Sequence, residues 1–122
     1  MTVPTLQMIT LDCAEMRPLA EFWSALLEWD VTHQQDEYAM LTGPGVALGI
    51  GQVEDYRSPD WPNENGGKQF HFDLGCEDIA ASETRFVELG ATVPDDQPGE
   101  TWRVLLDPAG HPFCLTDAAN WG

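Results

Sequence analysis

Basic residues are scarce in this sequence. Its 122 residues contain five lysines and arginines against 21 aspartates and glutamates, a formal net charge of −16 at pH 7. Such a charge repels phosphate backbones and anionic lipid surfaces, so we expect neither nucleic acid nor a membrane as a partner. An acidic surface most often serves solubility. It also creates a negative electrostatic field that favours a cationic ligand.

Cysteines are few, and long apolar runs are absent. Cys13, Cys76 and Cys114 are an odd number without a C-x-x-C pair. No apolar run approaches the about 20 residues that span a bilayer, and no signal-like segment opens the chain. We therefore expect a cytoplasmic protein with reduced thiols. Each cysteine has strand-like apolar neighbours, which favours a small buried packing group over a nucleophile.

The sequence does contain an order of elements that occurs twice. Residues 6–13 alternate apolar and polar side chains, which predicts a half-buried strand. Residues 17–28 carry apolar side chains at helical spacing, and Pro18 suits the first turn of that helix. Short strands separated by turn residues are then predicted at 31–34, 38–42 and 46–53.

The same order starts again after a connection at about 55–68 that is rich in proline and glycine. A strand is predicted over 69–76, and a helix over 79–89 that ends at Gly90, which suits a left-handed cap. Further strands are predicted at 91–93, 101–106 and 112–116, with Asp107–Gly110 as the last hairpin turn. The two halves match at an offset of 62 residues, from Leu27 to Leu89, so we interpret the chain as an internal duplication.

These elements predict an α+β fold of two tandem βαβββ modules, at about 5–54 and 69–118 of one domain, whose curved mixed sheet surrounds a pocket. The segments ITLDCAEMRPLAEFWSALLEW and FHFDLGCEDIAASETRFVELGA, with the closing LLDPAGHPFCLTD, resemble the vicinal oxygen chelate (VOC) superfamily. That superfamily includes glyoxalase I, bleomycin resistance proteins and extradiol dioxygenases. The likeness is greatest to its glyoxalase-like subgroup, and it implies the glyoxalase/bleomycin resistance fold and a homodimer.

The resemblance also implies positions for one divalent ion, held by His, Gln or Glu on the first and last strands of each module. His71 fits one of these positions. Met8, or Gln7 if the register slips, occupies the equivalent position in the first module, and a thioether is a poor ligand for a hard ion. Cys114 stands where a glutamate is usual, and the last strand of the first module offers only Gln52. We therefore expect no catalytic metal. A soft-metal site on His71 and Cys114 is the weaker alternative, because it lacks a third anionic ligand.

The pocket is expected to gather polar side chains from the first strand of each module. Asp73 shares a strand face with His71, and Asp12 lies on the polar face of the first strand. Trp102 is the preferred aromatic wall for a planar or cationic ligand. Arg103 is expected to pair with a surface acid. The predicted ligand-binding residues are Met8, Thr10, Asp12, His71, Asp73, Trp102 and Cys114.

Two functional hypotheses follow, and they differ in chemistry. The leading one is a metal-independent protein that binds a small, cationic molecule, as the bleomycin resistance branch does. The alternative is a lyase, isomerase or dioxygenase-type enzyme that uses His71 with or without a divalent metal. In an enzyme, His71 with Asp73 or Asp12 would be the acid–base pair, whereas a hydrogen-bonded structural histidine is about equally consistent with the sequence. A third hypothesis, a module that regulates a partner enzyme, has no sequence feature in its favour.

Overall fold

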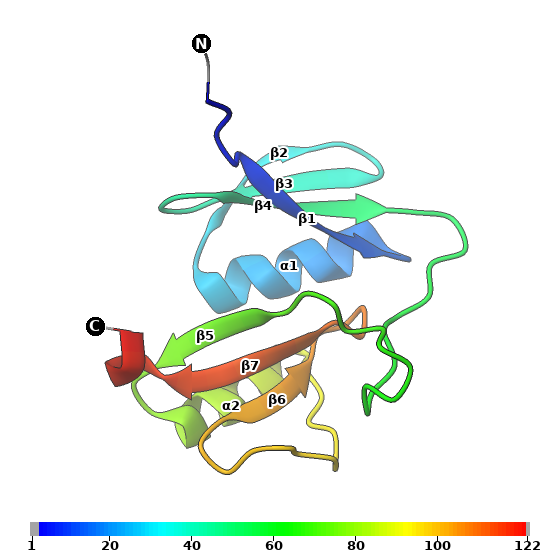
Figure 1. The fold of residues 1–122 in the computed structure, drawn as a ribbon. Helices are drawn as coiled ribbons and strands as arrows, with labels where there is room; N and C mark the ends of the chain where they lie inside the picture. Colours follow the sequence, from blue (N-terminus) through cyan, green and yellow to red (C-terminus); the bar gives the residue numbers. More distant parts are fainter. Residues whose placement is uncertain (1–2, 122) are drawn as a thin grey trace. The chain divides into compact units, whose positions relative to one another are not determined.

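The computed structural model describes residues 3–121 (Figure 1). The chain divides into two compact units, Met1–Arg57 and Ser58–Gly122, and the boundary lies within the connection predicted at about 55–68. Each unit has its own sheet and its own α-helix. Among the described residues, no helix is both long and apolar enough to cross a membrane.

The first unit is a four-stranded mixed sheet with one helix. Its elements in chain order are β1 (Met8–Cys13), α1 (Met16–Leu27), β2 (Asp30–Gln34), β3 (Tyr38–Thr42) and β4 (Ala47–Gln52). The strand order is β1-β4-β3-β2, in which β1 and β4 are parallel and the other pairs antiparallel. Leu19 and Trp23 of α1 are fully buried, as are Leu41 and Ile50 of the sheet, so the predicted apolar stripe of the helix forms the core.

Helix α1 obtains its N-terminal cap from a distant strand. Glu15, the residue before the helix, makes no side-chain cap hydrogen bond. Instead the backbone N–H of Met16 donates to Oε1 of Gln52, at the end of β4, over 3.0 Å. Gln52 was the one candidate oxygen ligand on this strand, and its oxygen satisfies a helix terminus instead.

The second unit is a three-stranded sheet with one α-helix and a short terminal helix. Its elements are β5 (Phe72–Cys76), α2 (Ile79–Leu89), β6 (Arg103–Leu106), β7 (Pro112–Asp117) and the 3₁₀ helix η1 (Ala118–Trp121). The order is β5-β7-β6, with β5 parallel and β6 antiparallel to β7. Asp78 caps α2 by accepting a hydrogen bond from Ala81, and Gly90 ends the helix at a φ of 127°.

The two units repeat one plan, although the second has three strands where the first has four. In both, the first strand pairs in parallel with the last, and a helix follows the first strand directly. The opening strands end 63 residues apart, at Cys13 and Cys76, whereas the helices end 62 residues apart, at Leu27 and Leu89. The difference arises because α1 has 12 residues and α2 has 11. The predicted α+β fold of two βαβββ-like modules is confirmed.

Residues 91–93 were predicted as a strand, and this was wrong. Only Thr92 forms a bridge, exchanging hydrogen bonds of 2.9 and 2.8 Å with Leu106. Pro94 lacks the N–H that a longer ladder would need. The side chain of Gln97 makes backbone hydrogen bonds of the kind that a neighbouring strand would make. Its Oε1 accepts from the N–H of Val104 over 2.8 Å, and its Nε2 donates to the Val104 carbonyl over 2.9 Å.

Strand boundaries in the second unit also differ from the prediction. Strand β5 begins at Phe72, so Phe70, which lies within the predicted strand 69–76, precedes the observed strand and is 92% exposed. Strand β6 begins at Arg103, which leaves Trp102 just outside it. His111 is half-buried beside the Asp107 turn, where its backbone N–H donates to the buried Asp107 carboxylate. The turn itself is formed as predicted, with Gly110 at a φ of 87°.

Candidate functional site

The second unit contains a cavity of about 570 Å³. Its wall includes Asp73 of β5, Val104 of β6 and Cys114 of β7, which the strand register places side by side. Because side chains alternate between sheet faces, Phe113 and Leu115 point the other way, into the core. The volume lies within the range of about 300–1,000 Å³ that is usual for small-molecule sites. The lining residues are Lys68, His71, Asp73, Pro98, Thr101, Trp102, Val104, Cys114, Thr116, Asn120 and Trp121.

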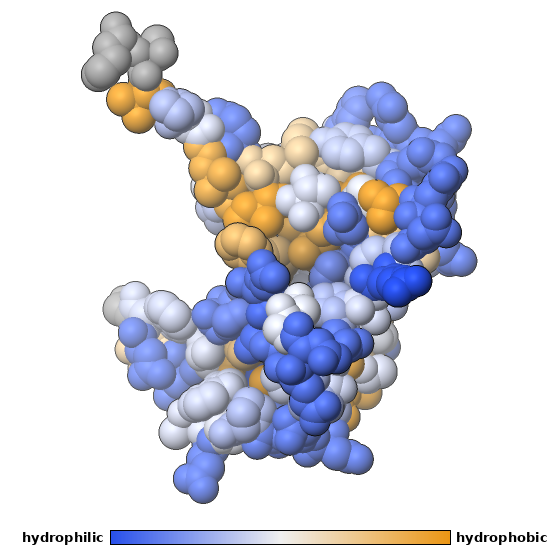
Figure 2. Space-filling model, turned by 45° about the vertical axis from the view of Figure 1, so that its right-hand side comes forward, coloured by the Kyte–Doolittle hydropathy of each residue, from blue (hydrophilic) through white to orange (hydrophobic). Residues whose placement is uncertain are grey.

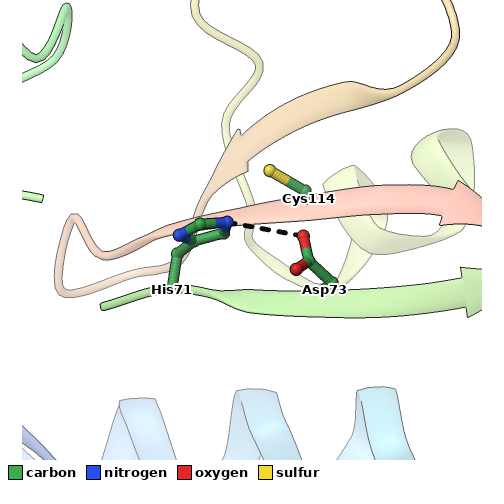
Figure 3. A group of neighbouring side chains, drawn as sticks. All are labelled: His71, Asp73 and Cys114. Carbon is green, nitrogen blue, oxygen red and sulfur yellow. Dashed lines mark ion pairs between the residues drawn. The ribbon is translucent and has the colours of Figure 1, made fainter. Parts of the chain in front are cut away.

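Three chemically active side chains meet in this cavity (Figure 3). His71 immediately precedes β5, and its Nε2 lies 3.4 Å from Oδ1 of Asp73, two residues later on the same face. Asp73 pairs in register with Cys114 of β7. Ligand atoms of the three residues all lie within 4.8 Å of one another. The imidazole and the carboxylate are about one third and two fifths exposed, at 33% and 43%, so both are accessible to a ligand.

The thiol of Cys114 is held in its protonated form. Burial is the largest cause that raises its pKa, and the negative charge of Asp73 and a side-chain hydrogen bond to Asp73 raise it further. The positive charge of Lys68 acts in the opposite direction. Since the thiolate is the nucleophilic form, this environment disfavours Cys114 as a nucleophile. All three cysteines are free and buried, as predicted.

Two tryptophans line the same cavity. The indole of Trp102 lies against Gly99, where an added Cβ would come within 2.4 Å of the ring, so a larger residue there would displace it. The indole N–H of Trp121 donates to Oγ1 of Thr116 over 2.8 Å, and that hydroxyl donates to the carbonyl of Leu74 over 2.9 Å. Trp102 was predicted as a wall. Trp121 was not; the only signal for it was an aromatic residue soon after the last predicted strand.

The candidate residues of the first unit lie together on β1. Met8, Thr10 and Asp12 share one strand face, beside Gly49 and Gly51 of β4. A Cβ on Gly49 would lie 2.6 Å from the Thr10 hydroxyl and 2.9 Å from the Met8 sulfur, so the glycine makes room for both.

The sulfur of Met8 already has a hydrogen-bonding neighbour, since the hydroxyl of Tyr38 donates to it over 3.5 Å. The structure therefore brings Met8, Thr10 and Asp12 together in the first unit. It brings His71, Asp73, Trp102 and Cys114 together in the second.

Arg103 does not belong to the cavity wall. Its Nε donates to the Glu83 carboxylate over 2.7 Å, so the predicted pairing with an acid is confirmed.

Comparison with known proteins identifies the family. Residues 8–116 match the family described as the glyoxalase-like domain. The chain belongs to the glyoxalase-like domain family. No curated protein matches the sequence.

Several solved structures share the fold. A glyoxalase/bleomycin resistance protein/dioxygenase family enzyme from Burkholderia phytofirmans PsJN superposes with a TM-score of 0.73 at 14% identity, covering 94% of this chain and 99% of that one. A glyoxalase-related enzyme from Fulvimarina pelagi has a TM-score of 0.67 at 19% identity, with 93% and 87% covered. A lactoylglutathione lyase from Agrobacterium tumefaciens has a TM-score of 0.64 at 16% identity, with 95% of each chain covered. At these identities the likeness concerns the fold alone.

The resemblance implies one divalent ion, and the donors in this glyoxalase-like protein do not fit a hard ion. Gln52 uses its oxygen to cap α1, and Met8 offers a thioether. Among residues 3–121, the one cluster of three potential ligands is His71, Asp73 and Cys114, in which a thiol takes the place of a carboxylate. Hard ions prefer a set of oxygen ligands, so this cluster does not suit them.

Proposed function

We propose that this glyoxalase-like protein binds a small organic cation in the cavity of its second unit and needs no catalytic divalent ion to do so. The observation that carries the proposal is the accessible carboxylate of Asp73 in a cavity that also has Trp102 and Trp121 in its wall. Carboxylates and aromatic faces both attract cations, and the attraction grows where water is partly excluded. The net charge of −16 favours the approach of such a ligand.

The positively charged side chain of Lys68 also lines this cavity. Its Nζ lies over the ring of Trp61, 5.4 Å from the centroid, so the ammonium has a partner other than Asp73. The carboxylate of Asp73 also contacts His71 and Cys114. Because Lys68 does not neutralise it, Asp73 would be the main anionic contact of an organic cation.

The test is a binding titration with aromatic and quaternary ammonium cations, followed by calorimetry in buffer with a chelator. We expect Asp73→Asn to weaken binding of any hit by about tenfold or more, or about 1.4 kcal/mol. Glu88→Gln is the matched control: it removes one negative charge from an exposed position on α2 that does not line the cavity. Equal losses in both variants would mean that only the overall charge matters, and the site assignment would fail.

A second candidate function is a lyase or isomerase. The observation in its favour is the distance of 3.4 Å between His71 and Asp73, which suits an acid–base pair. The relative from Agrobacterium tumefaciens is named a lactoylglutathione lyase, so formation of lactoylglutathione is the first reaction to assay. Turnover that is lost in His71→Gln would favour the enzyme; ligand binding without turnover would favour the binding protein.

The assembly and location of the protein are part of the same proposal. We propose a cytoplasmic homodimer, and the support for the location is the three free cysteines. The support for the dimer is the family resemblance together with the exposed apolar side chains of Val3, Leu6 and Ile9 near the N-terminus.

A further inference from the structure

An asparagine is followed directly by a glycine, Asn65 and Gly66, in the connection that precedes β5. Residues 62–67 are all exposed and belong to no helix or strand. Gly66 has a φ of 68°, and a Cβ added to it would come within 4 Å of no described atom beyond its chain neighbours. Solvent therefore reaches the backbone and the side chain of this pair, as is typical of a loop tip.

We propose that Asn65 is a site of spontaneous deamidation, and that the acidic product loosens the connection beside the cavity. This covalent modification needs water and no enzyme. It goes beyond the proposed function, because it requires no ligand in the cavity.

The reaction joins the backbone nitrogen of Gly66 to the side chain of Asn65. The nitrogen gives its proton to solvent base and attacks Cγ of Asn65. The N–Cγ bond forms, the Cγ–Nδ2 bond breaks, and Nδ2 takes up a proton and leaves as ammonia. Water then opens the cyclic imide at either carbonyl, which gives aspartate or isoaspartate at position 65. No group is oxidised or reduced, and water is the only co-reactant.

The residue after the asparagine decides how easily this ring closes. Gly66 has no side chain to shield its nitrogen, and its backbone adopts conformations that other residues reach with difficulty. Among the described residues, no backbone acceptor takes the Gly66 N–H, so no hydrogen bond of that kind has to break. Asn63 provides the contrast within the same loop. Glu64 follows it, and its Oδ1 accepts from the backbone N–H of Lys68 over 2.9 Å.

Deamidation would change how the connection is held. Nδ2 of Asn65 donates to Oδ2 of Asp60 over 3.1 Å. In the product a carboxylate replaces this donor, so two negative charges meet where a hydrogen bond was. Nearby, the Trp61 indole donates to the Asp96 carbonyl over 3.0 Å, and the Lys68 ammonium lies 5.4 Å from the centre of the Trp61 ring. Because Lys68 also lines the cavity, a looser connection releases a cavity residue.

Ageing of the whole folded protein tests the site without any variant. The protein is incubated in warm, mildly alkaline buffer, digested briefly with trypsin and analysed by mass spectrometry. Trypsin cleaves after Arg57 and Lys68, so it releases residues 58–68 as one peptide that contains both Asn65 and Asn63. We expect the mass increase from amide to acid to appear at Asn65 several-fold faster than at Asn63.

A sample unfolded in guanidinium and aged alongside shows what the fold contributes. We expect similar rates at Asn65 in both samples, because the pair is exposed in the folded protein too. Conversion confined to the unfolded sample would overturn the site, and so would equal rates at Asn63 and Asn65. Asn65→Gln should abolish the early product, since the longer side chain has to close a larger ring.

The effect on the connection is tested with Asn65→Asp. Lys68 is the one lysine of the sequence, so the rate at which an amine-selective acylating reagent modifies it reports on the connection. We expect this rate, measured by peptide mass spectrometry, to rise several-fold as the contact with Asp60 is lost. Asn63→Asp is the matched control, because it adds the same charge and keeps an oxygen acceptor for the Lys68 N–H. An unchanged rate in Asn65→Asp, or an equal rise in both variants, would refute the loosening.

Discussion

At the scale of single residues, Asp73 is the side chain on which the candidate site depends. Its carboxylate lies 3.4 Å from His71, accepts a hydrogen bond from Cys114 and is exposed in the cavity. One charge therefore sets the environment of an imidazole and a thiol, and it is also the main anionic contact available to a ligand. Changing Asp73 should alter all three.

The reactivity of Cys114 should report on this charge. The pKa of the thiol is raised by burial and by Asp73, so its thiolate fraction at neutral pH is small. Asp73→Asn removes the negative charge, which lowers the pKa again and increases the thiolate fraction between neutral pH and the thiol pKa. We expect faster alkylation of Cys114 by iodoacetamide in that pH range, measured by mass spectrometry in metal-free buffer.

The internal reference for this experiment is Cys76, whose alkylation is followed in the same samples. Cys76 donates weakly to the carbonyl of Leu74 and lies on the opposite face of β5 from Asp73. An unchanged or slower reaction of Cys114 in Asp73→Asn, relative to Cys76, would contradict the assignment of the raised pKa to Asp73.

At the scale of elements, the side chain of Gln97 holds the loop between α2 and β6 by hydrogen bonds to the backbone. The Gln97 amide exchanges two hydrogen bonds with the backbone of Val104 and gives a third to the carbonyl of Pro94. The same loop carries Pro98, which lines the cavity, and Gly99, against which Trp102 packs. Gln97 therefore connects the stability of the sheet edge with the shape of the cavity.

Replacing Gln97 by Ala should destabilise the protein. Three partly buried hydrogen bonds are lost, and at the usual net value of each the free energy of unfolding should fall by about 1–3 kcal/mol. Urea denaturation followed by circular dichroism measures the change. Gln69→Ala, at an exposed position before β5, serves as the control. A loss no larger than that of the control would show that water replaces the Gln97 amide without cost.

At the scale of the molecule, the N-terminal segment presents apolar side chains to solvent. Figure 2 shows apolar surface on the first unit next to the chain's beginning. Val3, Leu6 and Ile9 are exposed there, and β1 is an edge strand of its sheet. An apolar edge strand tends to pair with a further chain, so this segment is the candidate contact of the proposed homodimer.

Light scattering coupled to size exclusion tests the assembly. We expect wild-type protein at twice the mass of one chain and the double variant Leu6→Asp, Ile9→Asp at a single mass, because charge on an apolar contact opposes its burial. Val87→Asp, at an exposed position on α2, should remain dimeric. A monomeric wild type would refute the dimer, and a dimeric double variant would place the contact elsewhere.

The sequence predicted most elements well, and the reason is local. Strand β3 and helix α2 have the predicted bounds, because their apolar spacing and flanking turn or cap residues lie within a few positions of each other. The prediction failed at 91–93 and at Phe70, where hydrogen bonds with distant partners decide whether an extended segment joins a sheet. Such partners leave no periodic signal in the segment itself.

The sequence by itself determined the repeated order of elements and the family resemblance, since each depends on residue types at particular positions. Only the tertiary structure decided that Asp73 faces Cys114 across the β5–β7 pair and that Trp121 joins Trp102 at the cavity. The register of a parallel pair depends on the packing of both strands and of the helix between them, which no local pattern specifies. That register turns three separate candidates into one cluster.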